Sequence, residues 1–460
     1  MKNYFLGIDI GTSSVKLLLS TKSGETISAK SEYETNNIAG WCDAIKRCLD
    51  RIKGSVPLSL ICAVSFSSQV GTYITDKGDI IPWFSSAGEQ ELNEIKLKCS
   101  EACFVEEIGM LHPELISYPL SRLLYIKRNF PEAESVIMPK EAVIFELTGN
   151  LVTDTFSQRG ICNPIKNEYS EKLLKLFNIG FKLPKILNPT DIAGYITENA
   201  SKTYGLPEGI PVYVGCNDFY AGLLGMGVLK NNTVFELSGT SEHLGVITKA
   251  RVDGKIISGK YFNGFATYGG TKSSGTSCDF AIKNFGIVEL DENLCITNQP
   301  IFLPYLKGER APVYDENARG VFFGITDKTT KSDMAYAILE GVVFSLYHIS
   351  EDLPIKNVSK IITGGGSAAD KLMAKIKAEL FDCEILRAKD NNSSALGAVI
   401  IAMVAHKAFG SFNDAIVSAV EYVSVAKPDG ANREKLLKRF EIYKKLYFSL
   451  KSQFEEFSKI

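Results

Sequence analysis

A carboxylate stands directly after a buried apolar segment, where a substrate hydroxyl could meet it. Val212, Tyr213 and Val214 are predicted to form a strand, and Asp218 follows at the turn that ends it. In open α/β sheets, ligands bind outside the carboxyl ends of strands, so we expect Asp218 to face a ligand and accept a proton from a hydroxyl. The competing interpretation is that Asn217 or Asp218 only caps the helix predicted after the turn.

A second candidate group lies near the N-terminus. A predicted strand that contains Asp9 leads into the turn Gly11, Thr12 and Ser13, and a return strand follows. Hydroxyls and free backbone N–H groups in a glycine turn suit phosphate oxygens. Asp9 beside the turn suits Mg²⁺, which prefers oxygen ligands and keeps several waters. Taken alone, an ordinary β-hairpin would explain the same residues.

The strand–turn–strand pattern recurs in the second half, over residues 233–249. Its turn residues are Gly239, Thr240 and Ser241. Each half also holds a strand followed by a glycine turn, near Ser65 and from Lys360. A structural repeat of about half the chain predicts two similar halves. Two such hairpins could grip one nucleotide from opposite sides.

A glycine-rich loop is the candidate for the adenine side of a nucleotide. Gly364, Gly365 and Gly366 follow an apolar strand and precede Asp370 and a predicted helix. Glycines let a backbone approach a flat ligand closely, and the start of a helix presents free N–H groups. The loop lacks the GxGxxG spacing of dinucleotide folds, and no GxxxxGK[ST] occurs, so a P-loop is excluded.

The elements that position these residues alternate along the chain. Predicted strands at 4–10, 15–20 and 60–66 alternate with helical patterns at 42–53 and 90–109, which favours an α/β fold. Cys99 and Cys103 are expected on one face of a single helix. The polar segment 228–232 predicts the boundary between two domains, residues 1–230 and 231–460. Residues 431–457 are predicted to form a long amphipathic helix.

Composition excludes several classes of function. The 460 residues are enough for about two to four domains. Lys and Arg number 51 against 53 Asp and Glu, and a net charge of −2 does not favour a nucleic acid or an anionic membrane as partner. Ten cysteines without CxxC pairs indicate a reduced, cytoplasmic chain. No signal-peptide pattern precedes Asp9, and the longest apolar run, 395–405, predicts a buried helix.

Together the motifs resemble those of the FGGY carbohydrate kinase family over nearly the whole chain. Residues 302–325 resemble its C-terminal signature, with Gly308, Glu309 and Arg310 in place. The segments LPEGIPVYVGCNDFYAGLLG, ELTGNLVTD and GGGSAADKLMAKIKAEL fit the family in the same order. The resemblance implies two ribonuclease H-like domains of the actin-like ATPase superfamily, with ATP and a sugar in the cleft between them.

The resemblance also implies roles for particular residues. Asp218 resembles the catalytic base, and Asp9 the aspartate near Mg²⁺ and the phosphates. Glu309 and Arg310 are expected to be mainly structural. The residues implied to contact ATP or its phosphates are Gly11, Thr12, Ser13, Gly239, Thr240, Ser241, Gly275, Gly365, Gly366 and Asp370.

The acceptor side departs from the family. Many members carry Trp-x-Asp-x-Arg, but here Trp83 is followed by Ser85 and Ala87 in place of the acid and the base. Gln69 and Trp83 are still expected to line the acceptor pocket, which should be less polar than usual. We therefore expect weak or absent activity on D-xylulose and glycerol. Substitution by nearby residues, or a local misalignment of this short loop, would remove that expectation.

The sequence thus predicts a cytoplasmic enzyme that uses ATP and Mg²⁺ to phosphorylate a hydroxyl of a sugar, polyol or related carbohydrate. Its partners are expected to be a small carbohydrate and neither nucleic acid nor membrane, with a homodimer left open. Two alternatives remain: an actin-like ATPase that switches a protein partner, and a non-catalytic ligand-binding protein on the kinase scaffold. The sugar and the hydroxyl are not determined by the residues.

Overall fold

The computed structural model describes residues 3–112, 116–239, 242–286, 290, 299–366 and 370–460. Their contacts group into two compact units. Unit 1 contains Met1–Gly227 and Asn392–Val420, and unit 2 contains Val228–Asn391 and Glu421–Ile460. The expected domains, 1–230 and 231–460, remain a prediction, but the compact units differ from them because Asn392–Val420 packs with unit 1.

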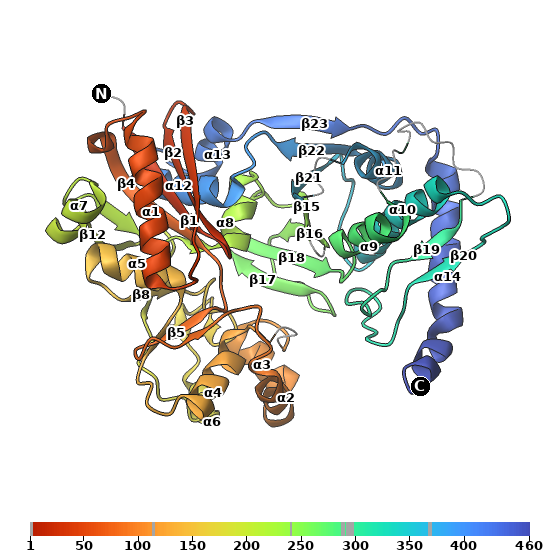
Figure 1. Ribbon diagram of the computed structural model, residues 1–460, viewed down its shortest axis with the longest axis horizontal. Coiled ribbons are helices and arrows are strands. Elements are labelled where there is room, and N and C mark those ends of the chain that lie inside the picture. The colour runs from red at the N-terminus through yellow and green to blue at the C-terminus, as the bar shows by residue number, and fades with distance from the viewer. Residues whose placement is uncertain (1–2, 113–115, 240–241, 287–289, 291–298, 367–369) are drawn as a thin grey trace. The chain divides into compact units, whose positions relative to one another are not determined.

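A mixed sheet forms the centre of unit 1 (Figure 1). Its strand order is β12-β13-β4-β1-β2-β3, and β14 pairs with β4 beside β13. Strand β1 runs antiparallel to β2 and parallel to β4. The strands are β1 (Tyr4–Ile10), β2 (Ser14–Thr21), β3 (Thr26–Glu32), β4 (Ile61–Ser68), β12 (Ile192–Tyr195), β13 (Pro211–Tyr213) and β14 (Cys216–Asn217).

Helices cover both faces of this sheet. Successive side chains of a strand point to opposite faces, so Leu6 and Ile8 of β1 join a core with Trp41 of α1, while Gly7 faces the other side. On that other side, a Cβ on Gly7 would lie 2.2 Å from the carbonyl oxygen of Ala395 in α12. The helices are α1 (Ile38–Lys53), α5 (Pro139–Thr148), α7 (Glu198–Tyr204), α8 (Asp218–Gly225), α12 (Ser393–Ala405) and α13 (Phe412–Ala419).

Glycines allow α8 and α12 to touch backbone to backbone. A Cβ on Gly225 would lie 1.9 Å from the carbonyl oxygen of Ser393, and one on Gly397 would lie 1.9 Å from that of Ala221. No side chain fits at such distances, so only glycine permits this packing. The contact explains why a segment far along the chain belongs to unit 1, where α12, drawn in blue, lies beside α8 (Figure 1).

A second layer of unit 1 has its own apolar core, which includes Phe104, Leu120 and Leu123. The prediction of a single helix over residues 90–109 is wrong, because two helices occupy this segment. Cys99 ends one helix, and Ser100 begins the next by accepting a hydrogen bond from Cys103 N, so the two cysteines do not share a helix. The elements are α2 (Glu89–Lys98), α3 (Glu101–Ile108), α4 (Pro119–Asn129), α6 (Glu171–Leu176), β5 (Tyr73–Thr75), β6 (Ile80–Ile81), β7 (Val136–Ile137), β8 (Val152–Asp154), β9 (Cys162–Asn163), β10 (Glu168–Tyr169) and β11 (Lys185–Leu187).

Unit 2 is built on a sheet with the order β17-β18-β16-β15-β21-β22-β23. Its strands are β15 (Val234–Ser238), β16 (Glu242–Thr248), β17 (Ile257–Tyr261), β18 (Gly264–Gly270), β21 (Lys360–Gly365), β22 (Glu384–Ala388) and β23 (Tyr422–Ala426), with a separate pair β19 (Ile301–Leu303) and β20 (Val321–Phe323). Its helices are α9 (Gly275–Phe285), α10 (Lys331–Ser350), α11 (Lys371–Phe381) and α14 (Arg433–Phe457).

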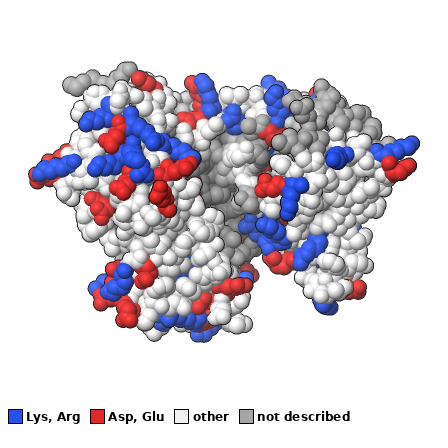
Figure 2. Space-filling view, viewed as in Figure 1, with Lys and Arg blue, Asp and Glu red and all other residues white. Residues whose placement is uncertain are grey.

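The two units repeat one arrangement of strands. In unit 1 the β1–β2 hairpin pairs through β1 with the parallel strand β4, and in unit 2 the β15–β16 hairpin pairs through β15 with the parallel strand β21. This confirms the predicted structural repeat and the predicted α/β fold of two similar parts. No helix among the described ranges is both long and apolar enough to cross a membrane. Where charges gather on the face drawn in Figure 2, Lys and Arg lie beside Asp and Glu.

Candidate active site

A cavity of about 210 Å³ lies within unit 1, at the ends of β1, β4 and β14. Four residues that the sequence singled out are in its wall: Thr12, Gln69, Trp83 and Asp218. The full lining is Thr12, Gln69, Val70, Gly71, Trp83, Ser117, Tyr118, Pro119, Ser157, Arg159 and Asp218. Residues from well-separated parts of the sequence therefore meet at one place, as the position after the strands predicts.

Asp218 is the first residue of α8, and its neighbour performs the capping. The side chain of Asn217 accepts a hydrogen bond from the backbone N–H of Tyr220 at 2.9 Å. The capping interpretation therefore applies to Asn217, and Asp218 lines the cavity. Burial, and next the negative charge of Asp9, raise the pKa of Asp218 to about 7, against the lowering effect of the Phe219 N–H and of Arg159. A carboxyl with this pKa can take up a proton near neutral pH.

Asp9 is buried near the end of β1 and is not among the residues that line the cavity. Its Oδ1 accepts a hydrogen bond from Ser67 Oγ on the parallel strand β4 at 2.8 Å. Desolvation raises the pKa of Asp9, while the Ser67 hydroxyl and the charge of Lys16 lower it. No group of three or more potential metal-ligating His, Cys, Asp or Glu occurs in the part of the chain that the structure describes.

The turn Gly11, Thr12 and Ser13 joins β1 to β2, as predicted. Thr12 and Ser13 are exposed. Gln69 holds this turn, because its Nε2 donates to the carbonyl oxygen of Gly11 at 3.1 Å. The indole Nε1 of Trp83 donates to Thr12 Oγ1 at 3.0 Å. The predicted phosphate turn and the predicted acceptor-side residues are thus connected by hydrogen bonds.

A buried arginine forms hydrogen bonds that hold the segment after Trp83 in place. Arg122 of α4 donates to Ser85 Oγ at 2.8 Å, to Ala87 O at 2.7 Å and to Trp83 O at 2.8 Å, with further bonds to Pro82 O and Ser85 O. Ser85 and Ala87 line a different surface pocket, beside α2 and α4. The altered positions therefore do not line the cavity that contains Asp218.

Sequence reasoning missed Arg159 and Ser157. Both lie in the loop after β8, five and three residues beyond Asp154, where the family-like segment ELTGNLVTD ends. The guanidinium of Arg159 lies 5.3 Å from the ring centre of Tyr118 and 5.9 Å from that of Tyr220. Arginine stacked on aromatic rings is held in place while it keeps its charge. The sequence signal that could have identified this residue is an arginine only five positions beyond the motif that ends at Asp154.

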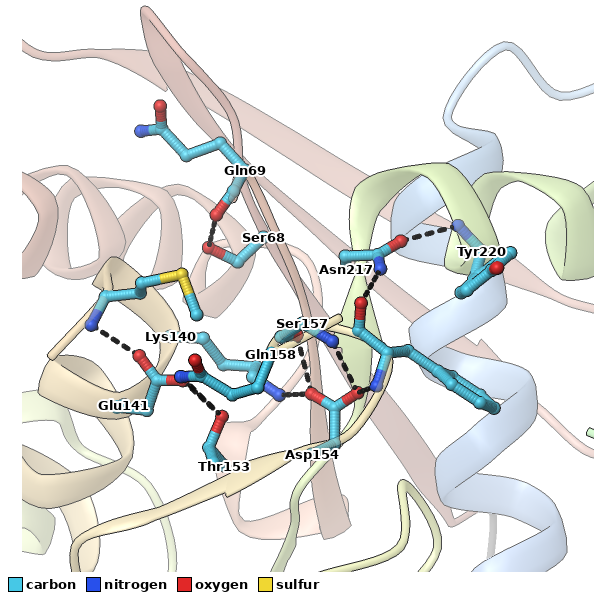
Figure 3. Close-up of polar contacts among 12 residues, drawn as sticks. Ser68, Gln69, Lys140, Glu141, Thr153, Asp154, Ser157, Gln158, Asn217 and Tyr220 are labelled. Carbon is cyan, nitrogen blue, oxygen red and sulfur yellow. Dashed lines mark hydrogen bonds and ion pairs between the residues drawn. The ribbon is translucent and has the colours of Figure 1, made fainter. Parts of the chain in front are cut away.

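Buried charges support this loop (Figure 3). Asp154 forms an ion pair with Lys140 inside the protein and accepts hydrogen bonds from Phe156 N at 2.8 Å and Ser157 N at 3.0 Å. Asn217 Nδ2 then donates to Phe156 O at 2.7 Å. The loop that carries Arg159 is therefore bonded to the residue directly before Asp218.

In unit 2, several of the residues predicted to contact nucleotide gather at the ends of β15 and β21. Gly239 follows β15, and its carbonyl oxygen accepts a hydrogen bond from Gly275 N at 3.0 Å. Gly365 ends β21 with φ of +94°, and a Cβ there would lie 1.8 Å from Ser238 O, so only glycine fits. Gly366 follows it, and Asp370 caps α11 by accepting from Met373 N at 2.9 Å. Thr240 and Ser241 lie outside the described residues.

Glu309 is buried in unit 2, where its side chain is hydrogen-bonded to neighbouring residues. Its carboxylate accepts hydrogen bonds from the backbone N–H of Lys272 and Arg310 and from the hydroxyl of Ser345. Burial raises the pKa of Glu309 to about 7.

Comparisons with known proteins match both halves of the chain. The model of the FGGY family of carbohydrate kinases, N-terminal domain, matches residues 4–225, and that of the C-terminal domain matches residues 237–406. A xylulose kinase of Staphylococcus xylosus is 28% identical over 486 residues, covering 96% of this chain and 99% of the relative. A gluconokinase of Bacillus subtilis is 26% identical over 465 residues, covering 90% of each.

Solved structures show the same fold. A ligand-bound xylulose kinase from Lactobacillus acidophilus has a TM-score of 0.87 at 24% identity and covers 99% of this chain and 100% of that one. A gluconate kinase from the same organism has a TM-score of 0.86 at 23% identity, with the same coverage.

Proposed function

Because this chain belongs to the FGGY family of carbohydrate kinases, we propose that Asp218 is the base that removes the proton from the carbohydrate hydroxyl being phosphorylated. The chain is an ATP-dependent phosphotransferase with a carbohydrate alcohol as acceptor, as the family matches show. The observation that carries the role of Asp218 is its place in the wall of a cavity with Gln69, Trp83 and Arg159, together with its raised pKa.

The proposed reaction is direct transfer from ATP to an acceptor held in this cavity. Asp218 in its ionised form accepts the hydroxyl proton as the oxygen attacks the phosphoryl group. Positioning and stabilisation of charge supply most of the rate in phosphoryl transfer, so the side chains that fix the acceptor matter as much as the base. Gln69 and Trp83 are proposed to line the acceptor, and Trp83 offers an apolar surface to its carbon chain.

Asp9 is the residue proposed to hold Mg²⁺. Its buried carboxyl has a raised pKa and also raises that of Asp218, so a cation beside it would relieve the repulsion between the two carboxylates. Mg²⁺ usually takes one or two protein carboxylates plus waters and substrate phosphates, which fits a lone aspartate. When bound, the ion neutralises charge on the phosphates. An Asp9→Asn variant should need more Mg²⁺ for its half-maximal rate, and an unchanged requirement would argue against this role.

The residues proposed to contact the nucleotide are glycines and turns, and each unit taken by itself carries some of them. Support comes from the two hairpins, which repeat the same strand pairing, and from Gly239, Gly275 and Gly365, which lie together in unit 2. The proposed contacts are Gly11, Thr12, Ser13, Gly239, Thr240, Ser241, Gly275, Gly365, Gly366 and Asp370.

The acceptor is proposed to come from the range of carbohydrates that the relatives' names indicate, which includes xylulose and gluconate. The two alternatives, an ATPase switch and a non-catalytic binding protein, find no support among the relatives. Residence in the cytoplasm is proposed because the described cysteines are free thiols, as expected in a reducing compartment.

The test of the proposed base is the variant Asp218→Asn. It should bind ATP and fold like the parent, but turnover with the best acceptor should fall by roughly 10²–10⁴, the usual scale of general-base catalysis. Asp50→Asn, on the exposed face of α1, is the matched control and should keep the parent rate. Turnover of Asp218→Asn at the parent rate would show that another group accepts the proton.

A further inference from the structure

We propose that the acceptor of this enzyme is an anionic carbohydrate, and that Arg159 binds its carboxylate or phosphate group. The inference rests on the proposed function, because it assumes that the cavity beside Asp218 holds the acceptor.

The charge of the cavity wall supports this inference. Among the described residues that line it, Arg159 is the only lysine or arginine and Asp218 the only carboxylate. Asp218 has to be ready to accept a proton, whereas a guanidinium stays charged at any physiological pH. Its planar fork of N–H donors matches the two oxygens of a carboxylate or phosphate, while a neutral hydroxyl cannot accept in this bidentate way.

The fold fixes the position of Arg159. Its guanidinium lies near two aromatic rings. One belongs to Tyr118 in the cavity wall, and the other to Tyr220, two positions after Asp218 in α8. The start of its loop is anchored by the buried carboxylate of Asp154 (Figure 3). The guanidinium lies against two rings, on a loop whose start is anchored by a buried carboxylate, and such preorganisation for a ligand reduces the cost of binding.

The segment after Trp83 supplies no charge to the cavity, because Ser85 and Ala87 are uncharged and line a different pocket. The other arginine near the cavity, Arg122, is buried and bonded to backbone oxygens of that same segment. It therefore holds Trp83 in place and does not reach the acceptor. Charge on the acceptor side of the cavity comes from a different element of the fold, the loop after β8.

The experiment compares acceptors that differ mainly in one charged group. D-gluconate is paired with D-glucitol, in which a hydroxymethyl group replaces the carboxylate, and D-xylulose 5-phosphate is paired with D-xylulose. The parent enzyme should prefer the anionic member of at least one pair by roughly 10- to 100-fold in kcat/KM, the scale of a hydrogen bond to a charged group. The pair that shows the preference distinguishes a carboxylate from a phosphate.

Variants assign the preference to Arg159. Arg159→Gln should lower kcat/KM for the anionic acceptor by roughly 10- to 100-fold and change that for the neutral one much less. Arg159→Lys keeps the charge and should retain part of the preference. Lys182→Gln removes a charge from the exposed surface of unit 1 and should leave the anionic-to-neutral ratio unchanged.

Several results would overturn the inference. Equal use of both members of each pair, or use of neutral members alone, would show that no anion is selected. An equal fall for both members in Arg159→Gln would place the arginine on the transferred phosphoryl group or in the fold. If thermal unfolding shows that Arg159→Gln is not folded, the inference is tested by the anionic-to-neutral ratio of kcat/KM in the parent enzyme and in Arg159→Lys. The proposal that Asp218 is the base is tested separately, because the turnover of Asp218→Asn can be measured with any acceptor that the parent enzyme uses.

Discussion

The indole Nε1 of Trp83 donates a hydrogen bond to Thr12 Oγ1 at 3.0 Å, which connects the acceptor-side segment to the turn proposed to bind phosphate. Trp83 is 40% exposed, so this bond helps to hold a ring that packing alone does not fix. With the bond from Gln69 Nε2 to Gly11 O, it is one of two side-chain hydrogen bonds that connect the proposed acceptor residues to this turn.

A double-mutant cycle of Trp83→Phe and Thr12→Val should reveal this coupling. Trp83→Phe keeps an aromatic ring but removes the donor, and Thr12→Val removes the acceptor. The kcat/KM values of the two single variants and the double variant should give a coupling of about 0.5–1.5 kcal/mol, the net value of one hydrogen bond. Strictly additive effects would show that the bond contributes nothing to catalysis.

The pH dependence of kcat/KM should follow Asp218. Burial and the charge of Asp9 raise the pKa of Asp218 to about 7, and the base has to be ionised to accept a proton. The rate should therefore rise with pH through about 7 and then level off. Because the charge of Arg159 lowers this pKa, Arg159→Gln should move the rising limb to higher pH. A limb that stays in place in this variant, or a rate that falls as pH rises toward 7, would contradict the assignment.

The buried pair Lys140 and Asp154 should be important for stability. Both side chains are almost inaccessible to solvent, so Lys140→Met would leave a buried carboxylate without its counter-charge. Removing one member of a buried ion pair costs about 3–5 kcal/mol of unfolding free energy. Denaturant unfolding of Lys140→Met should show a loss of this size.

Lys202→Met is the control for that measurement. Its exposed partner Glu198 lies four residues earlier in α7, and pairs of this kind contribute only about 0.3–0.5 kcal/mol. Equal losses in the two variants would mean that the buried pair has no special part in holding the loop after β8.

Neutral short acceptors should be poor substrates. Arg159 is in the wall of the cavity, where an anionic acceptor would pair with its charge and a neutral acceptor would not. We expect a kcat/KM for D-xylulose and for glycerol below about 10⁴ M⁻¹s⁻¹, under the ordinary range for enzymes. A coupled assay of ADP formation measures both, and a value in the ordinary range for either compound would refute the expectation.

The sequence by itself determined the local elements that carry the proposed base and its neighbours. The strands that hold Asp9 and precede Asp218, the turn at Gly11 and the repeat of the hairpin in the second half were all predictable. They depend on apolar runs, glycines and turn residues that are close together in the chain. The break between Cys99 and Ser100 was missed, because a capping serine ended a pattern that otherwise continues as a helix.

The tertiary structure alone decided which distant residues meet. The close approach of Gly225 to Ser393 packs α12 into unit 1, although α12 is far along the chain. The loop after β8 places Arg159 in the same cavity wall as Asp218. Arg122 donates hydrogen bonds to Ser85, 37 residues away in the chain, and Ser85 lines a pocket other than the one that contains Asp218. Such pairings depend on packing, buried charges and backbone approach over long separations in the chain, and no local pattern of residues encodes them.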